Sequence, residues 1–200
     1  MEQITELALD ISMSTGWAIG SPDMVRPTSG VYRTYAWKGN QEQRVLEFYN
    51  WLEEKHKEHR LTGICYEYTF IDAKRFDPDF IECQKSYVAM VWLFCAQRGL
   101  RVAHCPIGTW RKQFLGAADR AAVRDLKGKE FRAERRDMNK GAAMKACALR
   151  GWMVADDNEA EACGILNARL SQLDRLYAQR SLPHARRVEL RAQRERYIGT

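Results

Sequence analysis

The chain has 200 residues, of which 46% are hydrophobic, and this is enough for one domain with a hydrophobic core. Its net charge of +6 and its pI of about 9.0 favour an acidic partner, nucleic acid first among them. Because the sequence shows no basic, apolar leader and no apolar run of about 18 residues, we expect neither a signal peptide nor a membrane span.

The first third of the chain predicts strands around one helix. Runs rich in apolar, β-branched and aromatic residues indicate strands at residues 4–11, 15–20, 29–37 and 61–70. The helical spacing between the last two strands predicts a helix from Asn40 to about His59. One face of this helix is expected to be buried by its apolar residues Val45, Leu46, Tyr49 and Leu52.

The remainder of the chain predicts helices around a last strand. Residues 80–98 form an apolar-faced helix ended by Gly99, and residues 100–105 form a strand closed by Pro106. Residues 117–137 are charged and poor in large apolar side chains, so they predict an exposed helix or a mobile loop. Further helices are expected at residues 140–150 and, capped by Asp156 or Asp157, from there to about Ala178.

This order of elements predicts an α/β fold. Three opening strands with short links suggest an antiparallel meander, and the later strands alternate with helices and suggest parallel crossovers. We therefore expect a mixed five-stranded sheet, three antiparallel strands and then parallel ones, flanked by helices. Residues 1–178 would form this domain, and residues 179–200 an arginine-rich, basic C-terminal extension.

Charge and cysteine content indicate the partner and the compartment. Residues 111–140 contain ten Lys or Arg against five Asp or Glu, and residues 169–200 contain eight Arg against three acids. Two basic segments beside a mildly acidic scaffold suit a protein that binds DNA with its loops and a metal with its core. The six cysteines show no CxxC pairing, so we expect reduced core thiols and a cytoplasmic protein.

Four carboxylates stand where packing alone would not put them. Asp10 ends the first strand, Glu67 interrupts the apolar run ICYEYTF, and Asp157 and Glu161 share one helical face. If the first and fourth strands are neighbours, the four acids meet. Hard Mg²⁺ or Mn²⁺ ions would then relieve their repulsion, and two ions would permit phosphodiester hydrolysis. Taken singly, Asp10 could lie in a turn, Glu67 could face solvent and Asp157 could be a plain N-cap.

The motifs LALDISMSTGWAIG, CYEYTF, PIGTWRKQFLG and DDNEAEACGIL keep an order that resembles the RuvC-type Holliday junction resolvases, in particular their phage-borne branch. The resemblance covers residues 4–170. It implies an RNase H-like fold, a homodimer, and symmetric, metal-dependent nicking of four-way DNA junctions, that is, a crossover junction endodeoxyribonuclease. The host would be a bacterial or phage-infected cell, and two Mg²⁺ or Mn²⁺ ions would serve each active site without a small-molecule cofactor.

Residue by residue, the resemblance assigns roles to this chain. Asp10 and Glu67 match two metal-binding acids of the family, and Asp157 or Asn158 followed by Glu161 matches its closing motif. Glu161 stands where the family has an aspartate, so activity could be reduced. Lys140 matches a basic residue near the scissile phosphate. Phe70 matches an aromatic that the family places at the branch point, although it could also fill the core. From their charge alone, the basic side chains expected along the DNA phosphates are Arg111, Lys112, Arg120, Arg124, Lys127 and Lys129.

Two alternatives stay open at this point. The chain could be a catalytically weakened protein that binds branched DNA without cutting it. Sugar kinases and actin-like ATPases also open with a strand turn of an aspartate and small residues that is similar to LDISMSTGWAIG, but those proteins need a second lobe and a longer chain. If the chain forms a dimer, the aromatic-rich helix that carries Tyr87, Val91 and Trp92 is a candidate interface, unless these side chains fill the core.

Overall fold

The structure, a computed structural model, describes residues 3–34, 40–68, 78–128 and 130–181. Five strands form one sheet in the order β3-β2-β1-β4-β5. Their bounds are β1 Glu6–Asp10, β2 Ser14–Gly20, β3 Thr28–Arg33, β4 Gly63–Tyr68 and β5 Arg101–Pro106. The first three strands pair antiparallel, whereas β4 runs parallel to both β1 and β5. The predicted mixed sheet is therefore confirmed.

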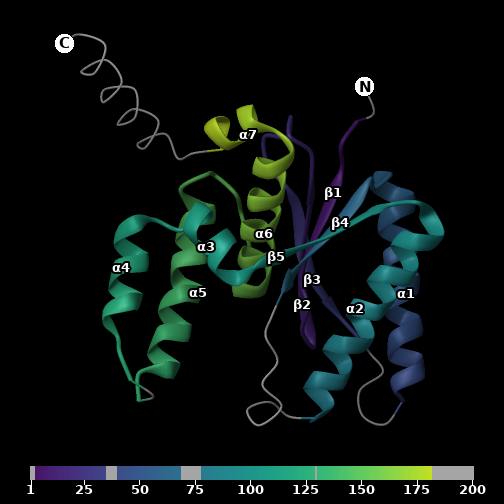
Figure 1. Ribbon diagram of the computed structural model, residues 1–200, viewed down its shortest axis with the longest axis horizontal. Coiled ribbons are helices and arrows are strands. Elements are labelled where there is room, and N and C mark those ends of the chain that lie inside the picture. Colours follow the sequence, from purple (N-terminus) through teal and green to yellow (C-terminus); the bar gives the residue numbers. More distant parts are fainter. Residues whose placement is uncertain (1–2, 35–39, 69–77, 129, 182–200) are drawn as a thin grey trace.

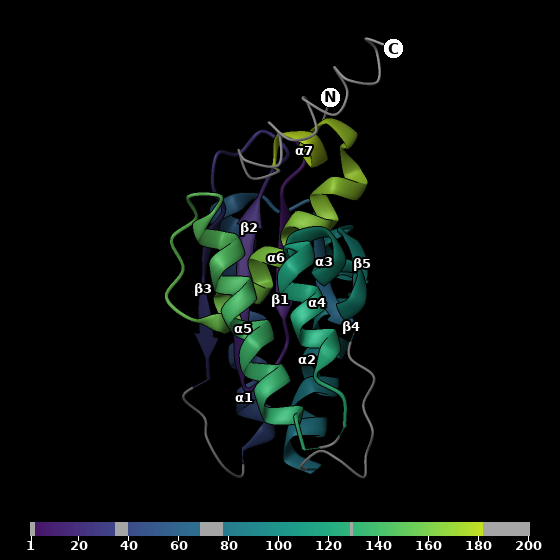
Figure 2. The same cartoon turned by 90° about the vertical axis from the view of Figure 1, so that its left-hand side faces the viewer.

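Helices cover both faces of the sheet (Figure 1). The helices are α1 Gln41–His59, α2 Pro78–Arg98, α3 Ile107–Phe114, α4 Ala117–Asp125, α5 Arg132–Ala148, α6 Asp157–Leu173 and α7 Arg175–Arg180. The first two lie on one face, and α6 with α3 and α5 lies on the other. In both views α4 and α5 stand side by side at the outside of the second layer, as a helical hairpin (Figure 2).

Alternation along β1 divides its side chains between two cores. Leu7 and Leu9 pack under α1 and α2 with Phe48 and Tyr87, whose rings stack at 4.0 Å. Ala8 belongs to the other core, which α3, α5 and α6 build. Because successive side chains of a strand point to opposite faces, the residues on either side of Leu7 and Leu9 face α6. This alternation directs Glu6 and Asp10, at the two ends of β1, toward the same helix.

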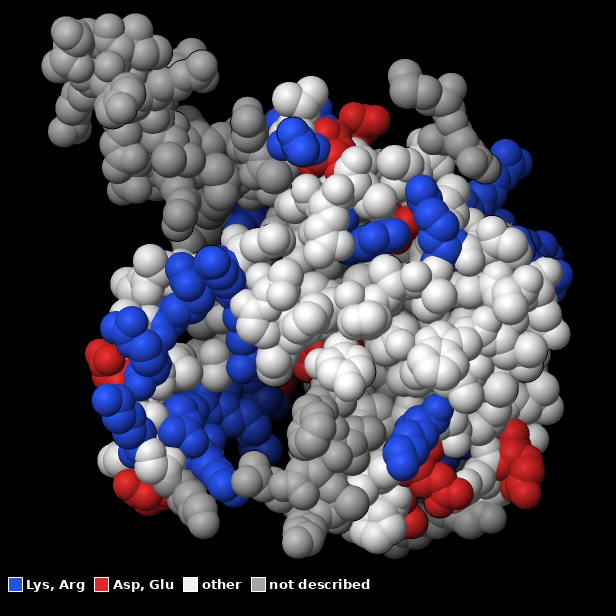
Figure 3. Space-filling model, in the orientation of Figure 1, with Lys and Arg blue, Asp and Glu red and all other residues white. Residues whose placement is uncertain are grey.

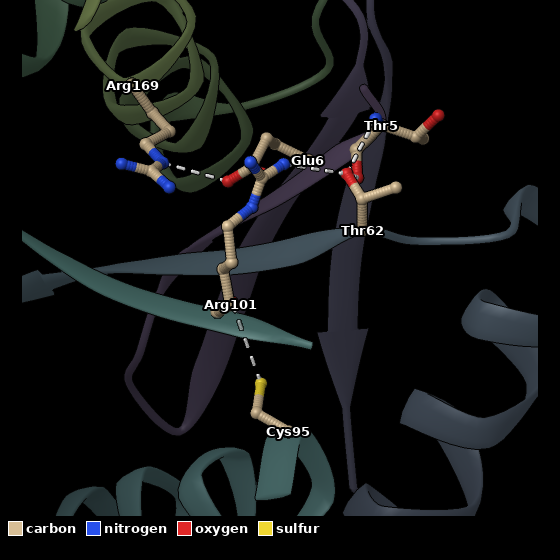
Figure 4. Close-up of polar contacts among 6 residues, drawn as sticks. All are labelled: Thr5, Glu6, Thr62, Cys95, Arg101 and Arg169. Atoms are coloured by element: carbon tan, nitrogen blue, oxygen red, sulfur yellow. Dashed lines mark hydrogen bonds and ion pairs between the residues drawn. The ribbon is translucent and has the colours of Figure 1, made fainter. Parts of the chain in front are cut away.

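The buried carboxylate of Glu6 is neutralised by arginines. Its oxygens accept from Arg169 Nε of α6 at 2.9 Å and from an Arg101 guanidinium nitrogen of β5 at 3.3 Å (Figure 4). Gly63 lies opposite in the register, and a Cβ there would approach Glu6 Oε1 to 2.4 Å, so glycine leaves room for the carboxylate. These contacts tie three elements together at the end of the sheet away from Asp10.

Three details differ from the sequence prediction. On α1, Arg44 and Phe48 are buried with Leu52, whereas Leu46 is 52% exposed, so the predicted face was partly wrong. The expected helix to Ala178 ends at Leu173, because Asp174 leaves the helical conformation and its side chain accepts from Leu176 N to cap α7. Residues 107–114, for which no element was predicted, form α3.

The charged stretch predicted as an exposed helix or loop is α4 followed by the first turns of α5. All six cysteines are buried and free, as expected. Residues 182–200, most of the predicted C-terminal extension, lie outside the described residues, and the predicted division at 178 stays a prediction. Over the described ranges, the structure has no helix with the length and apolar character needed to cross a bilayer.

Candidate active site

Asp10 and Glu67 lie at the same edge of the sheet, at the carboxyl ends of two adjacent parallel strands. The register pairs Leu9 of β1 with Tyr66 of β4, and Asp10 and Glu67 are the next residues on each strand. Tyr66 packs under α2 with Leu9, so Glu67, like Asp10, belongs to the face covered by α6. The side-by-side placement that the sequence predicted is confirmed.

The first turn of α6 is brought against this edge by a glycine. Asp156 caps the helix by accepting from Glu159 N at 3.0 Å. Gly16 of β2 is the register partner of Asp10, and a Cβ on Gly16 would lie 1.9 Å from the backbone oxygen of Asn158. Because Gly16 lacks this atom, the turn that carries Asp157 can lie close to Asp10.

The four carboxylates act on one another electrostatically. Burial raises the pKa of Asp10 well above its usual value, and the negative charges of Glu161 and Glu67, and more weakly of Asp157, raise it further. Burial also raises the pKa of Glu161; the Arg111 guanidinium opposes this rise, while Glu67 and Asp157 add to it. Only carboxylates that are close together affect each other in this way, so the structure brings the four predicted acids to one spot.

Two cations of the chain enter this cluster. Arg111 of α3 pairs with Glu161 at 3.1 Å, and the ammonium of Lys140 of α5 forms an ion pair with Asp157. With the side chains paired in this way, no group of three or more His, Cys, Asp or Glu among the described residues is arranged to hold a metal ion. The four acids therefore lie together, and Arg111 and Lys140 neutralise part of their negative charge.

Sequence analysis missed the partner of Glu67. The fully buried indole of Trp110 on α3 donates from Nε1 to Glu67 Oε2 at 2.6 Å. Gly164 of α6 makes space for this ring, since a Cβ there would lie 2.6 Å from Trp110 Cε3. The glycine at 164 thus accommodates α3 against α6. The sequence PIGTWRKQFLG shows a tryptophan that could donate a hydrogen bond, but it does not show that β4 lies opposite this residue.

Replacing Trp110 by phenylalanine tests this contact. The variant keeps an aromatic ring against Gly164 but loses the indole N–H that donates to the Glu67 carboxylate, and a hydrogen bond to a charged group typically contributes about 1.5–3 kcal/mol. We expect a lower midpoint of denaturant unfolding and, if the chain is a nuclease, about tenfold slower cleavage. Trp152→Phe, which removes an indole donor to Val25 O away from the cluster, is the control. Equal cleavage by wild type and Trp110→Phe would contradict the role of this hydrogen bond.

The other predicted residues are placed as follows. Asp157 lies in the cluster, where its charge raises the pKa of Asp10 and of Glu161, and the backbone of Asn158 lies against Gly16. Lys112 is exposed on α3. Arg120 and Arg124 lie on α4, and Lys127 is exposed in the connection that follows. Phe70 and Lys129 lie outside the described residues.

Glu159, which the sequence analysis did not single out, is structural. Its carboxylate accepts from Ser29 Oγ of β3 and from Ala155 N, both at 2.6 Å, while its own N–H donates to Asp156. These bonds tie the start of α6 to the edge strand β3 and so hold the turn that presents Asp157.

A mixed sheet of this order, with acids at the ends of its two central parallel-paired strands and an acidic helix start against them, defines an RNase H-like fold. No protein-family model matches the chain, and no curated protein matches it by sequence. Solved structures do: T. thermophilus RuvC in complex with Holliday junction substrate has 12% identity, covers 85% of this chain and 96% of its own, and gives a TM-score of 0.59.

A second T. thermophilus RuvC structure gives 16% identity and a TM-score of 0.54 over the same shares of the two chains. The yeast mitochondrial Holliday junction resolvase Ydc2 gives 10% identity and a TM-score of 0.50, over 88% of this chain and 84% of its own. The chain therefore has the fold of the RuvC-type resolvases, as the motifs suggested.

Proposed function

We propose that this chain is a metal-dependent endodeoxyribonuclease that resolves four-way DNA junctions by paired nicks. The observation that carries the proposal is the convergence of Asp10, Glu67, Asp157 and Glu161 at one edge of a RuvC-type fold. Among the solved structures that share this fold, one is RuvC bound to a Holliday junction substrate and another is a Holliday junction resolvase.

The donor set fits hard divalent cations. Four carboxylates gathered at a sheet edge repel one another, and this repulsion adds to the effect of burial in raising the pKa of Asp10 and Glu161. Oxygen ligands of this kind suit Mg²⁺ or Mn²⁺. Asp10, Glu67, Asp157 and Glu161 would hold the ions. When bound, two such ions activate a water and stabilise the leaving oxygen of a phosphodiester.

The chain's own residues orient this chemistry. The buried indole of Trp110 fixes the Glu67 carboxylate, and Gln84 of α2 donates to the Ile11 carbonyl at 3.2 Å, which holds the backbone directly after Asp10. Arg111 and Lys140 reach the cluster from α3 and α5, so a scissile phosphate at this edge would lie within the field of two positive side chains.

A basic surface adjoins the site. Figure 3 shows Lys and Arg side chains gathered over α4 and α5, around a hollow between this hairpin and the rest of the face. The cations of the hairpin surface are Arg120, Arg124, Lys127, Arg132, Arg135 and Arg136. Arg135 donates to Leu126 O at 2.7 Å, which fixes the connection between the two helices. We propose that this hairpin surface follows the DNA backbone beside the cleaved strand.

Arg124→Gln tests the hairpin surface. The Arg124 side chain is 79% exposed and lies 3.8 Å from Asp125, so its removal should leave folding unchanged. If it neutralises a phosphate, junction binding weakens equally for all sequences, and the slope of log K against log salt becomes shallower by about 0.9. Lys57→Gln, on the exposed end of α1, is the control. Fluorescence anisotropy at several salt concentrations measures the junction affinity and its salt dependence for both variants. An unchanged slope for Arg124→Gln would show that Arg124 does not contact a phosphate.

A homodimer would place two such sites on one junction. On α2, Tyr87 and Val91 prove to be core, but Trp92 and Leu93 beside them are 55% and 44% exposed. Trp92 also lines an apolar groove of about 320 Å³ with Tyr68 and Val88, next to Glu67. We propose that a second copy of the chain covers Trp92, Leu93 and the groove beside them. Sedimentation velocity of the free protein tests this proposal, which predicts a dimer.

Cleavage of a synthetic four-way junction tests the function. The proposal predicts symmetric nicks on two opposite strands with Mg²⁺ or Mn²⁺, and no cleavage of a linear duplex with the same sequence. Junction binding without any nick, in either metal, would contradict the nuclease and favour a protein that only binds branched DNA.

A further inference from the structure

Two positively charged side chains, Arg111 and Lys140, are paired with acids that would bind metal ions in the proposed active site. The guanidinium of Arg111 lies 3.1 Å from Glu161, and both side chains are mostly buried, 25% and 14% exposed. The Lys140 ammonium is paired with Asp157, with side chains 36% and 28% exposed. Asp157 Oδ2 is buried and has no hydrogen bond within the described residues, so the ion pair is its neutralising contact there.

These pairs differ from an ordinary salt bridge on the same helix. Lys145, five residues after Lys140 on α5, binds Asp119 of α4 at 2.9 Å with its own side chain 59% exposed. Such an exposed pair contributes little to stability. Arg111, by contrast, is mostly buried against Glu161, and its charge also opposes the rise in the pKa of Asp10, a second acid of the cluster.

The same carboxylate oxygens cannot serve both sets of cations. An ammonium or guanidinium within hydrogen-bond distance of a ligand oxygen repels a divalent ion on that oxygen and occupies its lone pairs. In the present arrangement two of the four acids are engaged by these cations, Glu161 by Arg111 and Asp157 by Lys140. Metal entry therefore requires that the two basic side chains move off the acids.

We propose that Arg111 and Lys140 are exchangeable counter-ions, which hold the carboxylate cluster together without metal and are released toward the DNA phosphate when divalent ions bind. Metal binding and substrate binding are then coupled, because each ion taken up frees a positive side chain at the edge where the phosphodiester lies. The release of the two side chains toward a DNA phosphate rests on the proposed function. Their role as counter-ions of the acids concerns the metal-free protein alone.

The test is calorimetric titration of Mn²⁺, without DNA, into wild type, Arg111→Gln and Lys140→Met. Removing a competing cation should tighten Mn²⁺ binding about fivefold in each variant, which corresponds to about 1 kcal/mol. The same variants should bind a junction more weakly than wild type when Mn²⁺ is present. Lys145→Met, which loses the exposed pair on the same helix, should match wild type in Mn²⁺ binding.

Thermal unfolding provides a second readout that does not depend on cleavage. In EDTA the Arg111 and Lys140 variants should unfold at a lower temperature than wild type, since their partner acids lose a counter-ion, and saturating Mn²⁺ should restore more of their stability. Metal binding that is unchanged or weaker in both variants would overturn the exchange, as would a wild type that takes up no divalent ion. Failure of wild type to nick a junction despite tighter metal binding by the variants would contradict the nuclease and leave the exchange supported.

Discussion

Asp10→Asn and Glu67→Gln are expected to reduce junction cleavage roughly a thousandfold or more while junction binding stays within a few fold of wild type. Each substitution removes a charged oxygen ligand from the cluster, and metal ions contribute several kcal/mol to the transition state of such reactions. Since each 1.36 kcal/mol is a factor of ten in rate, the loss reaches three orders of magnitude.

The same substitution at Asp10 should stabilise the metal-free protein. Burial and the neighbouring acids raise the pKa of Asp10 in the folded state. Stability from its protonated form is therefore fully present below the unfolded pKa of about 3.9 and is lost as pH rises through the folded pKa. At neutral pH in EDTA, Asp10→Asn should unfold at a higher temperature than wild type. Retained cleavage by either variant would contradict the proposed role of Asp10 and Glu67 in catalysis. A less stable Asp10→Asn protein in EDTA would contradict the repulsion among the clustered acids.

Gly16→Ala is expected to destabilise the protein and to reduce cleavage, although residue 16 carries no functional group. The new Cβ would lie 1.9 Å from the Asn158 backbone oxygen, so the start of α6 must move away from β2 and carry Asp157 with it. Overpacking of this kind costs typically about 1–3 kcal/mol. A displacement of about 1 Å at a catalytic group can cost a hundredfold in rate.

Gly141→Ala is the matched control. Gly141 lies inside α5, and a Cβ there meets no atom within 4 Å, so alanine should stabilise the helix by up to about 1 kcal/mol. Urea unfolding of the two variants separates the effects: Gly16→Ala should unfold at lower urea than wild type and Gly141→Ala at higher urea. If Gly16→Ala were as stable and as active as wild type, the contact between β2 and α6 would not position the site.

Local patterns predicted the sheet and its four acids. Alternation in ELALD and GICYEY fixes which side chains share a face, and a carboxylate that interrupts such a run is visible without a structure. Asp157 and Glu161 were visible because residues four apart share a helical face. What the pattern left open was the partner of each acid, which depends on packing between elements distant in the chain.

The missed interactions of the buried acids are of this long-range kind. Trp110 reaches Glu67 across 43 positions, and Glu6 was passed over as part of a strand although it is bound by Arg169, 163 residues away. The break of the last helix at Asp174 was missed because a side chain that caps a new helix reads, in sequence, like any polar residue on an exposed face. Spacing predicts the face of an element, but only packing determines what lies opposite.

A crystal structure with Mn²⁺, located by its anomalous scattering, tests the central claim most directly. The account predicts Mn²⁺ bound by the carboxylates of Asp10 and Glu67, with Arg111 and Lys140 moved from the positions in which they now pair with Glu161 and Asp157. A manganese-saturated crystal with no anomalous peak at these four acids, or with both ion pairs intact beside a peak elsewhere, would contradict it.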